Sequence, residues 1–233
     1  MKSHGSEFKL IDRGFSETLV LISGWATDYR IFEKLDLPYN YLFTIKLDPF
    51  NFKGRLREDL NNRHIDKISL FGYSLGGFLA YEFALGYPQM IDEFILTGIR
   101  KKYPKDTIAA VRARLKEDKE AYLRDFYTAF FSSADKESFI WFRKNLLKDY
   151  VENMRLEGLL SGLDYLENVT IDPQRLNPFQ KLKIIHGKED KIAPLVEVEG
   201  FRAFLPGARF IFFDRLGHIP FLSRQFKDRF YNG

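Results

Sequence analysis

The stretch Gly72-Tyr73-Ser74-Leu75-Gly76-Gly77 decides the fold of this 233-residue chain. The segment 67–72 before it predicts a buried strand, and residues 76–86 after it, rich in Ala, Leu and aromatics, predict a helix. The strand therefore passes into the helix within a few residues, and the glycines at 72 and 76 permit a turn too tight for side chains. Such a turn lifts the Ser74 hydroxyl above the sheet and points the amino terminus of the helix at it.

Strands and helices alternate on both sides of this turn. The predicted strands cover residues 19–23, 41–47, 67–72, 91–97, 182–186 and 209–213. The helix-like stretches between them and after the last strand include 28–35, 76–86, 195–204 and 219–230. Because this alternation favours parallel pairing with right-handed crossovers, we expect a mostly parallel, twisted α/β sheet with helices on both faces.

The alternation stops between residues 101 and 178. The pattern there predicts amphipathic helices over 106–118, 120–131, 135–148 and 150–162. A helical block inserted between two parallel strands is expected to lie over the carboxyl ends of the strands, where open α/β sheets bind ligands. We therefore predict a core made of residues 1–100 and 179–233, with a helical lid (cap) over 101–178.

A serine hydroxyl needs a neighbouring base to become a good nucleophile. Among the four histidines, His218 follows the last predicted strand, whereas His186 lies inside one. Asp190 follows the strand before that and would hold the imidazole tautomer, with the adjacent Glu189 as the alternative acid. The chain order of serine, acid and histidine is that of the α/β-hydrolase fold, so Ser74, Asp190 and His218 are the candidate catalytic triad of a serine hydrolase.

Backbone N–H groups beside Ser74 can stabilise a developing oxyanion. One such group belongs to Leu75, at the start of the helix. The second is expected from Trp25, in the loop 23–27 after the first buried strand. We predict that Trp25 lines the substrate pocket, and the alternative is a packing role at the edge of the loop.

Composition excludes several classes of protein. There is no cysteine, which excludes a disulfide framework and thiolate metal sites. The net charge of +4 is dispersed among acidic residues, so nucleic acid is a poor candidate partner. No segment approaches the ~18 apolar residues of a membrane span, and we expect a cytoplasmic protein with no membrane contact. No metal or nucleotide signature is present, so we expect no metal and no cofactor.

Three stretches carry a resemblance to a known family: Ser23-Gly24-Trp25, the serine turn, and His218-Ile219-Pro220-Phe221-Leu222-Ser223. The chain resembles the pimeloyl-acyl carrier protein methyl ester esterases of biotin biosynthesis from about residue 19 to 230. The resemblance implies a carboxylesterase with the same triad, Trp25 and Leu75 at the ester carbonyl, and Phe126 lining the acyl channel. The chain departs from this family in two places. It has Ser23-Gly24 where many hydrolases have His-Gly. It is also shorter before the serine turn, with only ~19 residues between the predicted strands that end at 47 and start at 67.

The resemblance also implies a basic lid face that docks the acidic acyl carrier protein. Residues 101–155 hold 13 Lys and Arg against 9 Asp and Glu, a local charge of +4. Arg143 and Lys144 are adjacent on the predicted helix 135–148, and Lys148 lies one turn beyond Lys144. Arg112 and Lys116 repeat this spacing on another helix. These cations are candidates for carrier docking, and ordinary solvated charges are the alternative.

Two other functions use the same fold. One is a broader esterase or thioesterase for small acyl substrates, because the same triad serves both and only the pocket decides. The other is a non-catalytic ligand receptor, which the loss of a triad member would favour. All three members are present. An epoxide hydrolase or dehalogenase would need an aspartate at position 74 and is excluded.

Overall fold

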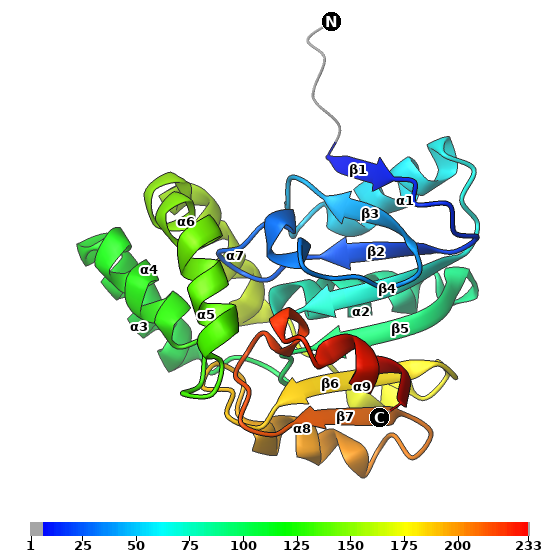
Figure 1. Ribbon diagram of the computed structural model, residues 1–233. Helices are drawn as coiled ribbons and strands as arrows, with labels where there is room; N and C mark the ends of the chain where they lie inside the picture. The colour runs from blue at the N-terminus through cyan, green and yellow to red at the C-terminus, as the bar shows by residue number, and fades with distance from the viewer. Residues whose placement is uncertain (1–6, 233) are drawn as a thin grey trace, which may run out of the picture.

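The sheet is parallel except at one edge (Figure 1). The computed structural model describes residues 7–232. Its strands lie in the spatial order β1-β3-β2-β4-β5-β6-β7. Their bounds are β1 Phe8–Ile11, β2 Thr18–Ile22, β3 Asn40–Thr44, β4 Ile68–Tyr73, β5 Ile91–Thr97, β6 Leu182–Gly187 and β7 Arg209–Phe213. Only β1 runs antiparallel to its neighbour β3, so the carboxyl ends of β2 to β7 meet at one edge of the sheet.

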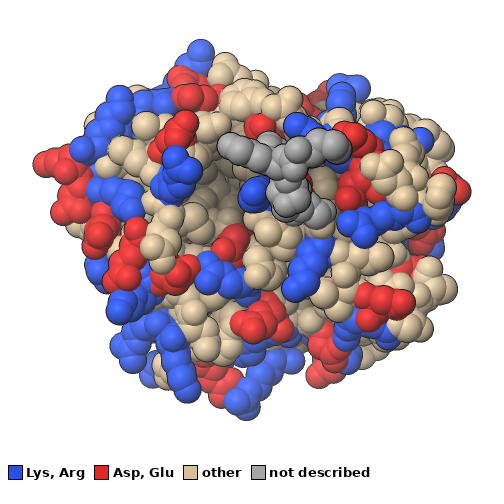
Figure 2. All heavy atoms as spheres, turned by 90° about the horizontal axis from the view of Figure 1, so that it is seen from above, with Lys and Arg blue, Asp and Glu red and all other residues tan. Residues whose placement is uncertain are grey.

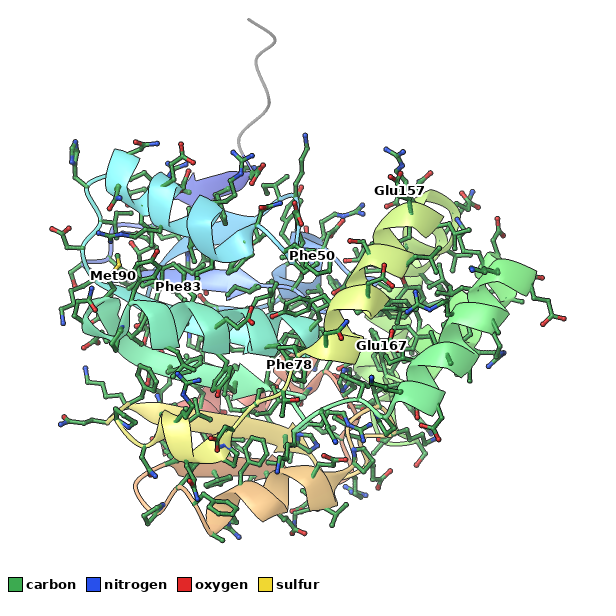
Figure 3. The ribbon with its side chains drawn as sticks, turned by 180° about the vertical axis from the view of Figure 1, so that it is seen from behind. Phe50, Phe78, Phe83, Met90, Glu157 and Glu167 are labelled. Carbon is green, nitrogen blue, oxygen red and sulfur yellow. The ribbon has the colours of Figure 1, made fainter. Side chains whose placement is uncertain are left out.

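Helices cover both faces of the sheet and bury its central strands. The helices packed on the sheet are α1 Phe52–Asn62, α2 Leu75–Gly86, α8 Leu195–Arg202 and α9 Phe226–Asn232, with 3-10 helices η1 Tyr29–Phe32, η2 Pro88–Met90, η4 Pro173–Leu176 and η5 Pro220–Leu222. The face seen in Figure 3 carries α1 and α2, and Phe78 and Phe83 of α2 are fully buried there. On the opposite face, Phe226 of α9 stacks on Phe213 of β7. Every residue of β2 and β4 is buried, as expected of parallel strands covered on both sides.

The prediction of a mostly parallel α/β sheet with helices on both faces is confirmed, while two elements at its edge were missed. The edge strand β1 buries only Phe8 fully, so its sequence lacks the continuous apolar run of an inner strand. Helix α1 falls in the short connection between predicted strands and buries Phe52, Leu56 and Leu60 at helical spacing. The predicted strand 41–47 ends earlier, at Thr44.

A helical insertion separates β5 from β6 and lies to one side of the sheet, beyond the carboxyl ends of the parallel strands (Figure 1). We define it by its helices, α3 Lys105–Glu117, α4 Lys119–Thr128, α5 Lys136–Phe142, the π-helical turn Arg143–Leu147, α6 Lys148–Asn153 and α7 Leu156–Asn168. Within residues 7–232 no helix is both long and apolar enough to cross a membrane. That the insertion acts as a lid stays a prediction.

In the second half of the insertion, the predicted boundary between helices 135–148 and 150–162 was wrong. The chain stays helical through the π-turn into α6 and breaks only at Met154 and Arg155, whose backbone is extended. No glycine or proline marks this break. The predicted last helix 219–230 was also wrong, because it divides into η5 and α9.

The turn between β4 and α2 is packed directly against the end of β2. A Cβ atom added to Gly76 would lie 2.2 Å from the carbonyl oxygen of Ile22, and one added to Gly72 would lie 2.7 Å from the carbonyl oxygen of Gly76. Both obstacles are backbone atoms and cannot move aside as a side chain would. The two glycines are therefore required by the close approach of helix to strand.

Substitution Gly76→Ala should destabilise the protein by about 3 kcal/mol, because overpacking against backbone forces the helix away from the sheet. Urea unfolding followed by circular dichroism measures the difference. The matched control is Gly158→Ala in α7, where an added Cβ meets nothing within 4 Å. That variant should gain about 0.5–1 kcal/mol from helix propensity. Equal stability of the two variants would contradict this account.

Candidate active site

Ser74 occupies a strained backbone conformation between β4 and α2. Its φ is +53° and its ψ is −117°, a region that residues other than glycine rarely adopt. The Ser74 N–H donates to the carbonyl of Thr97 at the end of β5, 2.9 Å away, which ties the turn to the neighbouring strand. Strain of this kind persists only where the surrounding structure enforces it, and it is typical of functional sites.

His218 and Asp190 form a buried hydrogen-bonded pair. The Nδ1 of His218 lies 2.7 Å from Oδ2 of Asp190, and both side chains are almost completely buried. A carboxylate only accepts hydrogen bonds, so Nδ1 carries the proton and Nε2 is the basic nitrogen of the neutral ring. Among the described residues, Nε2 has no hydrogen-bond partner. The predicted alternative acid, Glu189, is exposed and makes no contact of this kind.

The Asp190 carboxylate is held on both of its oxygens. Its Oδ1 accepts the backbone N–H groups of Ile192 and Ala193, each at 2.8 Å. Burial works to raise the pKa of Asp190, but the charge and hydrogen bond of His218 outweigh it and hold that pKa below its usual value. The carboxylate is therefore ionised and fixed in orientation at neutral pH.

His218 lies beside the residues that flank and hold the Ser74 turn, at the carboxyl edge of the sheet. A Cβ atom added to Gly98 would lie 3.0 Å from Cε1 of His218, and Gly98 directly follows Thr97, the residue bound to the Ser74 N–H. The Tyr73 ring lies 5.1 Å from the His218 ring, centroid to centroid. The structure thus joins His218 to Asp190 and places this pair next to the turn that carries Ser74, while the described residues show no hydrogen bond between Ser74 and His218.

The loop 23–27 packs on Ser74. A Cβ atom on Gly24 would lie 3.0 Å from the Cβ of Ser74. Ser23 Oγ donates to the carbonyl of Thr27 at 3.3 Å, and Thr27 Oγ1 donates to the carbonyl of Gly24 at 3.0 Å. The serine that replaces the histidine of many hydrolases therefore closes the loop on itself and leaves the Trp25 backbone beside the serine turn.

Trp25 joins the loop to the insertion. Its indole Nε1 donates to the carbonyl of Leu159 in α7 at 2.9 Å, and its ring meets Phe126 of α4 edge-on at 4.9 Å. A Cβ atom on Gly162 would lie 2.6 Å from the indole, so α7 approaches this ring closely. The two interpretations of Trp25 are therefore compatible, since the residue packs against the insertion and also lines a cavity.

A cavity of about 160 Å³ opens onto Ser74. Its wall includes Trp25 and Phe126, as the resemblance implied, together with the apolar side chains Ile108, Val111, Leu163 and Leu166. Sequence analysis missed Tyr103 and Arg100 in the same wall. Burial raises the pKa of Tyr103 to about 12, while a hydrogen bond with Ser74 lowers it, so its hydroxyl faces the serine as a neutral group. The guanidinium of Arg100 lies over the Tyr103 ring. Both residues follow β5 at the carboxyl edge of the sheet, and that position could have indicated them.

A second cavity of about 320 Å³ has the loop 23–27 in its wall. It is lined by Gly24, Trp25 and Leu75 from the core and by Met154 and Arg155 from the insertion. Figure 2 shows the surface hollowed between the insertion, on the left, and the sheet, on the right. Trp25 is thus part of the wall of both cavities, one of which reaches Ser74 and the other Leu75.

His186, which was rejected as the base in favour of His218, lies next to the acid Asp190. It is completely buried, its Nε2 donates to the carbonyl of Ala193 at 2.7 Å, and the same nitrogen is 3.6 Å from Oδ2 of Asp190. Burial lowers the pKa of His186 below its usual value of 6.5, against the charge of Asp190. The ring is therefore neutral in the folded protein at neutral pH.

This burial predicts an acid-sensitive contribution to stability. Below pH 6.5 the unfolded chain binds a proton at His186 that the folded chain does not, so stability falls as the pH falls. The loss attributable to this residue between pH 7 and 5.5 grows with the extent to which burial lowers the pKa of His186, up to about 1 kcal/mol for a ring that stays neutral throughout. His186→Gln should lose correspondingly less stability than the unsubstituted protein over that interval, as measured by urea unfolding. Identical pH dependence in the two proteins would show that His186 is protonated in the fold.

Comparison with known proteins places this site in a family. A family model described as the alpha/beta hydrolase fold matches residues 56–225. The pimeloyl-[acyl-carrier protein] methyl ester esterase of Nitrosomonas europaea is 25% identical, over 90% of this chain and 92% of its own length. A 2-hydroxy-6-oxononadienedioate/2-hydroxy-6-oxononatrienedioate hydrolase of Paraburkholderia phymatum is 28% identical, over 87% of this chain and 81% of its own length.

A solved structure agrees with this placement. An esterase of Thermogutta terrifontis superposes with a TM-score of 0.79 at 16% identity, covering 95% of this chain and 90% of the esterase. A likeness at that identity shows the fold alone. The predicted resemblance to pimeloyl-acyl carrier protein methyl ester esterases is confirmed, as is the prediction of a hydrolase enzyme. The family model covers well over half of the sequence, and the chain belongs to the alpha/beta hydrolase fold family.

Proposed function

We propose that this protein is a serine carboxylesterase with Ser74 as nucleophile, His218 as base and Asp190 as the acid that orients the base. The observation that carries the proposal is the buried 2.7 Å bond from His218 Nδ1 to Asp190. That bond leaves the basic Nε2 free at the edge of the sheet where the strained Ser74 turn stands. A serine, an oriented imidazole and a buried carboxylate are the parts that acyl transfer requires.

The proposed reaction has two halves. In the first, Ser74 Oγ attacks the ester carbonyl while His218 Nε2 takes the hydroxyl proton, and the imidazolium then gives that proton to the departing alcohol. In the second, His218 takes a proton from water, the resulting hydroxide attacks the acyl-enzyme, and the carboxylic acid leaves as Ser74 regains its proton. The backbone N–H groups of Leu75 and Trp25 stabilise the oxyanion in both halves, and Asp190 stabilises the imidazolium.

We propose as substrate a methyl ester of an acyl chain presented on acyl carrier protein. The support is the similarity to esterases named for that substrate, which extends over about 90% of this chain. One cavity opens onto Ser74 and a second is lined by Leu75, which fits a substrate that extends in two directions from the ester, with Phe126 and Trp25 against its apolar part. No group in the proposed reaction calls for a cofactor.

The second candidate is an esterase or thioesterase for small free acyl substrates. The cavity that opens onto Ser74 favours it, since 160 Å³ is close to the volume of an apolar cavity that holds one benzene molecule. A short acyl group fills that space without any carrier. Incubation of the protein with methyl-pimeloyl carrier protein and, in parallel, with short nitrophenyl esters separates the two candidates by their kcat/KM.

The proposed carrier-docking residues lie on the outer surface of the insertion. Arg143, Lys144 and Lys148 are all exposed, and within residues 7–232 none of them forms an ion pair. Arg112, which shares the same helical spacing, is instead bound to Asp164 and Glu167 of α7. Figure 3 shows Glu167 on α7, where that helix passes the first helices of the insertion. Arg112 is therefore a structural contact between helices, and the docking proposal rests on the other three cations.

Charge on the insertion is mixed rather than gathered into one basic face. Lys and Arg alternate with Asp and Glu over the part of it that Figure 2 shows. Docking by three cations would act mainly on the rate of encounter with an acidic carrier, and that effect weakens as salt screens it. Docking by these three cations should therefore be visible in kcat/KM for the carrier-bound ester and in its dependence on salt concentration.

Substitution Ser74→Ala should lower kcat for any ester by roughly 10⁴–10⁶, because it removes the nucleophile and leaves the fold intact. A fluorophosphonate probe should label the unsubstituted protein at Ser74, as located by mass spectrometry of the labelled peptide. Labelling of a different serine, or near-normal activity of the variant with an unchanged circular dichroism spectrum, would refute the mechanism.

Reversal of Arg143, Lys144 and Lys148 to Glu should lower kcat/KM for the carrier-bound ester at least ten-fold, about 1.4 kcal/mol, with the loss shrinking as salt is added. The same triple variant should cleave a nitrophenyl ester at the normal rate. The matched control reverses three exposed lysines that lie outside the insertion, Lys9, Lys53 and Lys67. It changes the net charge by the same amount. Equal losses in the two triple variants would mean that net charge, and not this face, governs docking.

A further inference from the structure

The loop that carries His218 is bound to the insertion by several backbone contacts. The His218 N–H donates to the carbonyl of Phe130 at 2.7 Å. One residue earlier, the Gly217 N–H donates to Oδ2 of Asp135 at 2.7 Å. The Ser132 hydroxyl donates to the carbonyl of Arg215. Residues 130–135, in the turn between α4 and α5, thus bind the loop at Arg215, Gly217 and His218. We call this segment the α4–α5 clamp.

Asp135 is the centre of the clamp. It is only 5% exposed, and its Oδ2 accepts the N–H of Gly217 and also that of Ser132, at 2.9 Å. Burial raises the pKa of Asp135, and the two backbone N–H groups oppose that rise. An ionised carboxylate in such a place is costly unless it is hydrogen-bonded, so the two N–H groups are what make its burial tolerable. One of these groups belongs to the catalytic loop, 82 residues away in the chain.

The backbones of the two segments are in direct contact at Gly217. A Cβ atom added to Gly217 would lie 2.2 Å from the carbonyl oxygen of Phe130 and 3.1 Å from the Ser132 nitrogen. The Phe130 ring lies 5.4 Å from the His218 ring. The loop therefore contacts the clamp through the backbone at Gly217 and through the Phe130 ring at His218.

On its other side, the loop is held by the core. The N–H of Glu189 donates to the carbonyl of Leu216 at 2.9 Å, and Asp190 Oδ2 accepts the His218 ring. The bond to Asp190 fixes the rotation of the imidazole but not the place of its backbone. That place is set by the opposing contacts to residue 189 and to the clamp. A displacement of about 1 Å at a catalytic group costs on the order of 10²-fold in rate.

We propose that Asp135 is a positioning residue for the base, and that the α4–α5 clamp belongs to the catalytic machinery and not only to the cover over the site. The inference rests on the proposed triad, since it assigns Asp135 a role through His218. The insertion consequently cannot swing away at this turn without withdrawing the base from Ser74. Any movement that admits substrate occurs elsewhere, at helices that do not contact the loop.

The test compares three substitutions with a small nitrophenyl ester as substrate. Asp135→Ala should lower kcat ten-fold or more with KM changed less than three-fold, and should slow fluorophosphonate labelling of Ser74 by the same factor as kcat. Asp135→Asn should keep most of kcat, because its amide oxygen can accept both N–H groups. The matched control is Asp125→Ala on the exposed face of α4, which should retain normal kcat. Rates are referred to the folded fraction, obtained by circular dichroism.

The outcomes separate this inference from the proposed function. If Ser74→Ala is inactive and Asp135→Ala has normal kcat per folded molecule, the clamp does not position the base. If Asp135→Ala and Asp135→Asn lose kcat equally, the charge and not the hydrogen-bonded placement is responsible, and the inference also fails. Should Asp135→Ala not fold, Ser132→Ala removes the bond to the Arg215 carbonyl, together with the bond that the Ser132 hydroxyl accepts from the Ala134 N–H inside the clamp, and should lower kcat about three-fold at constant KM. Normal kcat in that variant would then overturn the proposal.

Discussion

The structure depends on the close contact between the start of α2 and the end of β2. The helix approaches until the Cα of Gly76 stands against the carbonyl of Ile22, with no room for a methyl group. Ser74 is thereby forced to a φ of +53° and held by the neighbouring strand through Thr97. Because the strands are parallel, the ends of β6 and β7 reach the same edge and deliver Asp190 and His218 to it. The geometry of the site is thus a consequence of how tightly one helix packs on the sheet.

Much of this architecture could be predicted from sequence. Inner parallel strands are buried on both faces, so they appear as continuous apolar runs that need no knowledge of their neighbours. The serine, acid and histidine each follow such a run, which indicated their common place at the sheet edge. The strand β1 could not be found in this way, because only Phe8 is fully buried and its existence depends on pairing with β3. The helix break at Met154 likewise has no local signal, since neither glycine nor proline marks it.

The parts of the site that sequence analysis missed depend on contacts between distant segments. Nothing near Asp135 distinguishes it from other acidic residues of the insertion, and its role comes from a bond to Gly217 across 82 residues. Tyr103 is a similar case, since its position after β5 is readable but its orientation toward Ser74 is not. Phe126 was found through resemblance, and its edge-on contact with Trp25 places the two rings together in the wall of the cavity. Residue types can thus indicate a triad, whereas its supporting contacts require the fold.

The bonds between the α4–α5 turn and the histidine loop bear on how such proteins diversify. Exchange of a whole insertion between relatives, cut after β5 and before β6, would keep the backbone bond from His218 to residue 130 but could lose the Asp135 carboxylate that accepts the Gly217 N–H. In such a chimaera, residue 135 comes from one parent and residue 217 from the other. An exchange that preserves the contact therefore has to retain an acceptor side chain at position 135 and a glycine at position 217, which lie in segments far apart in the gene.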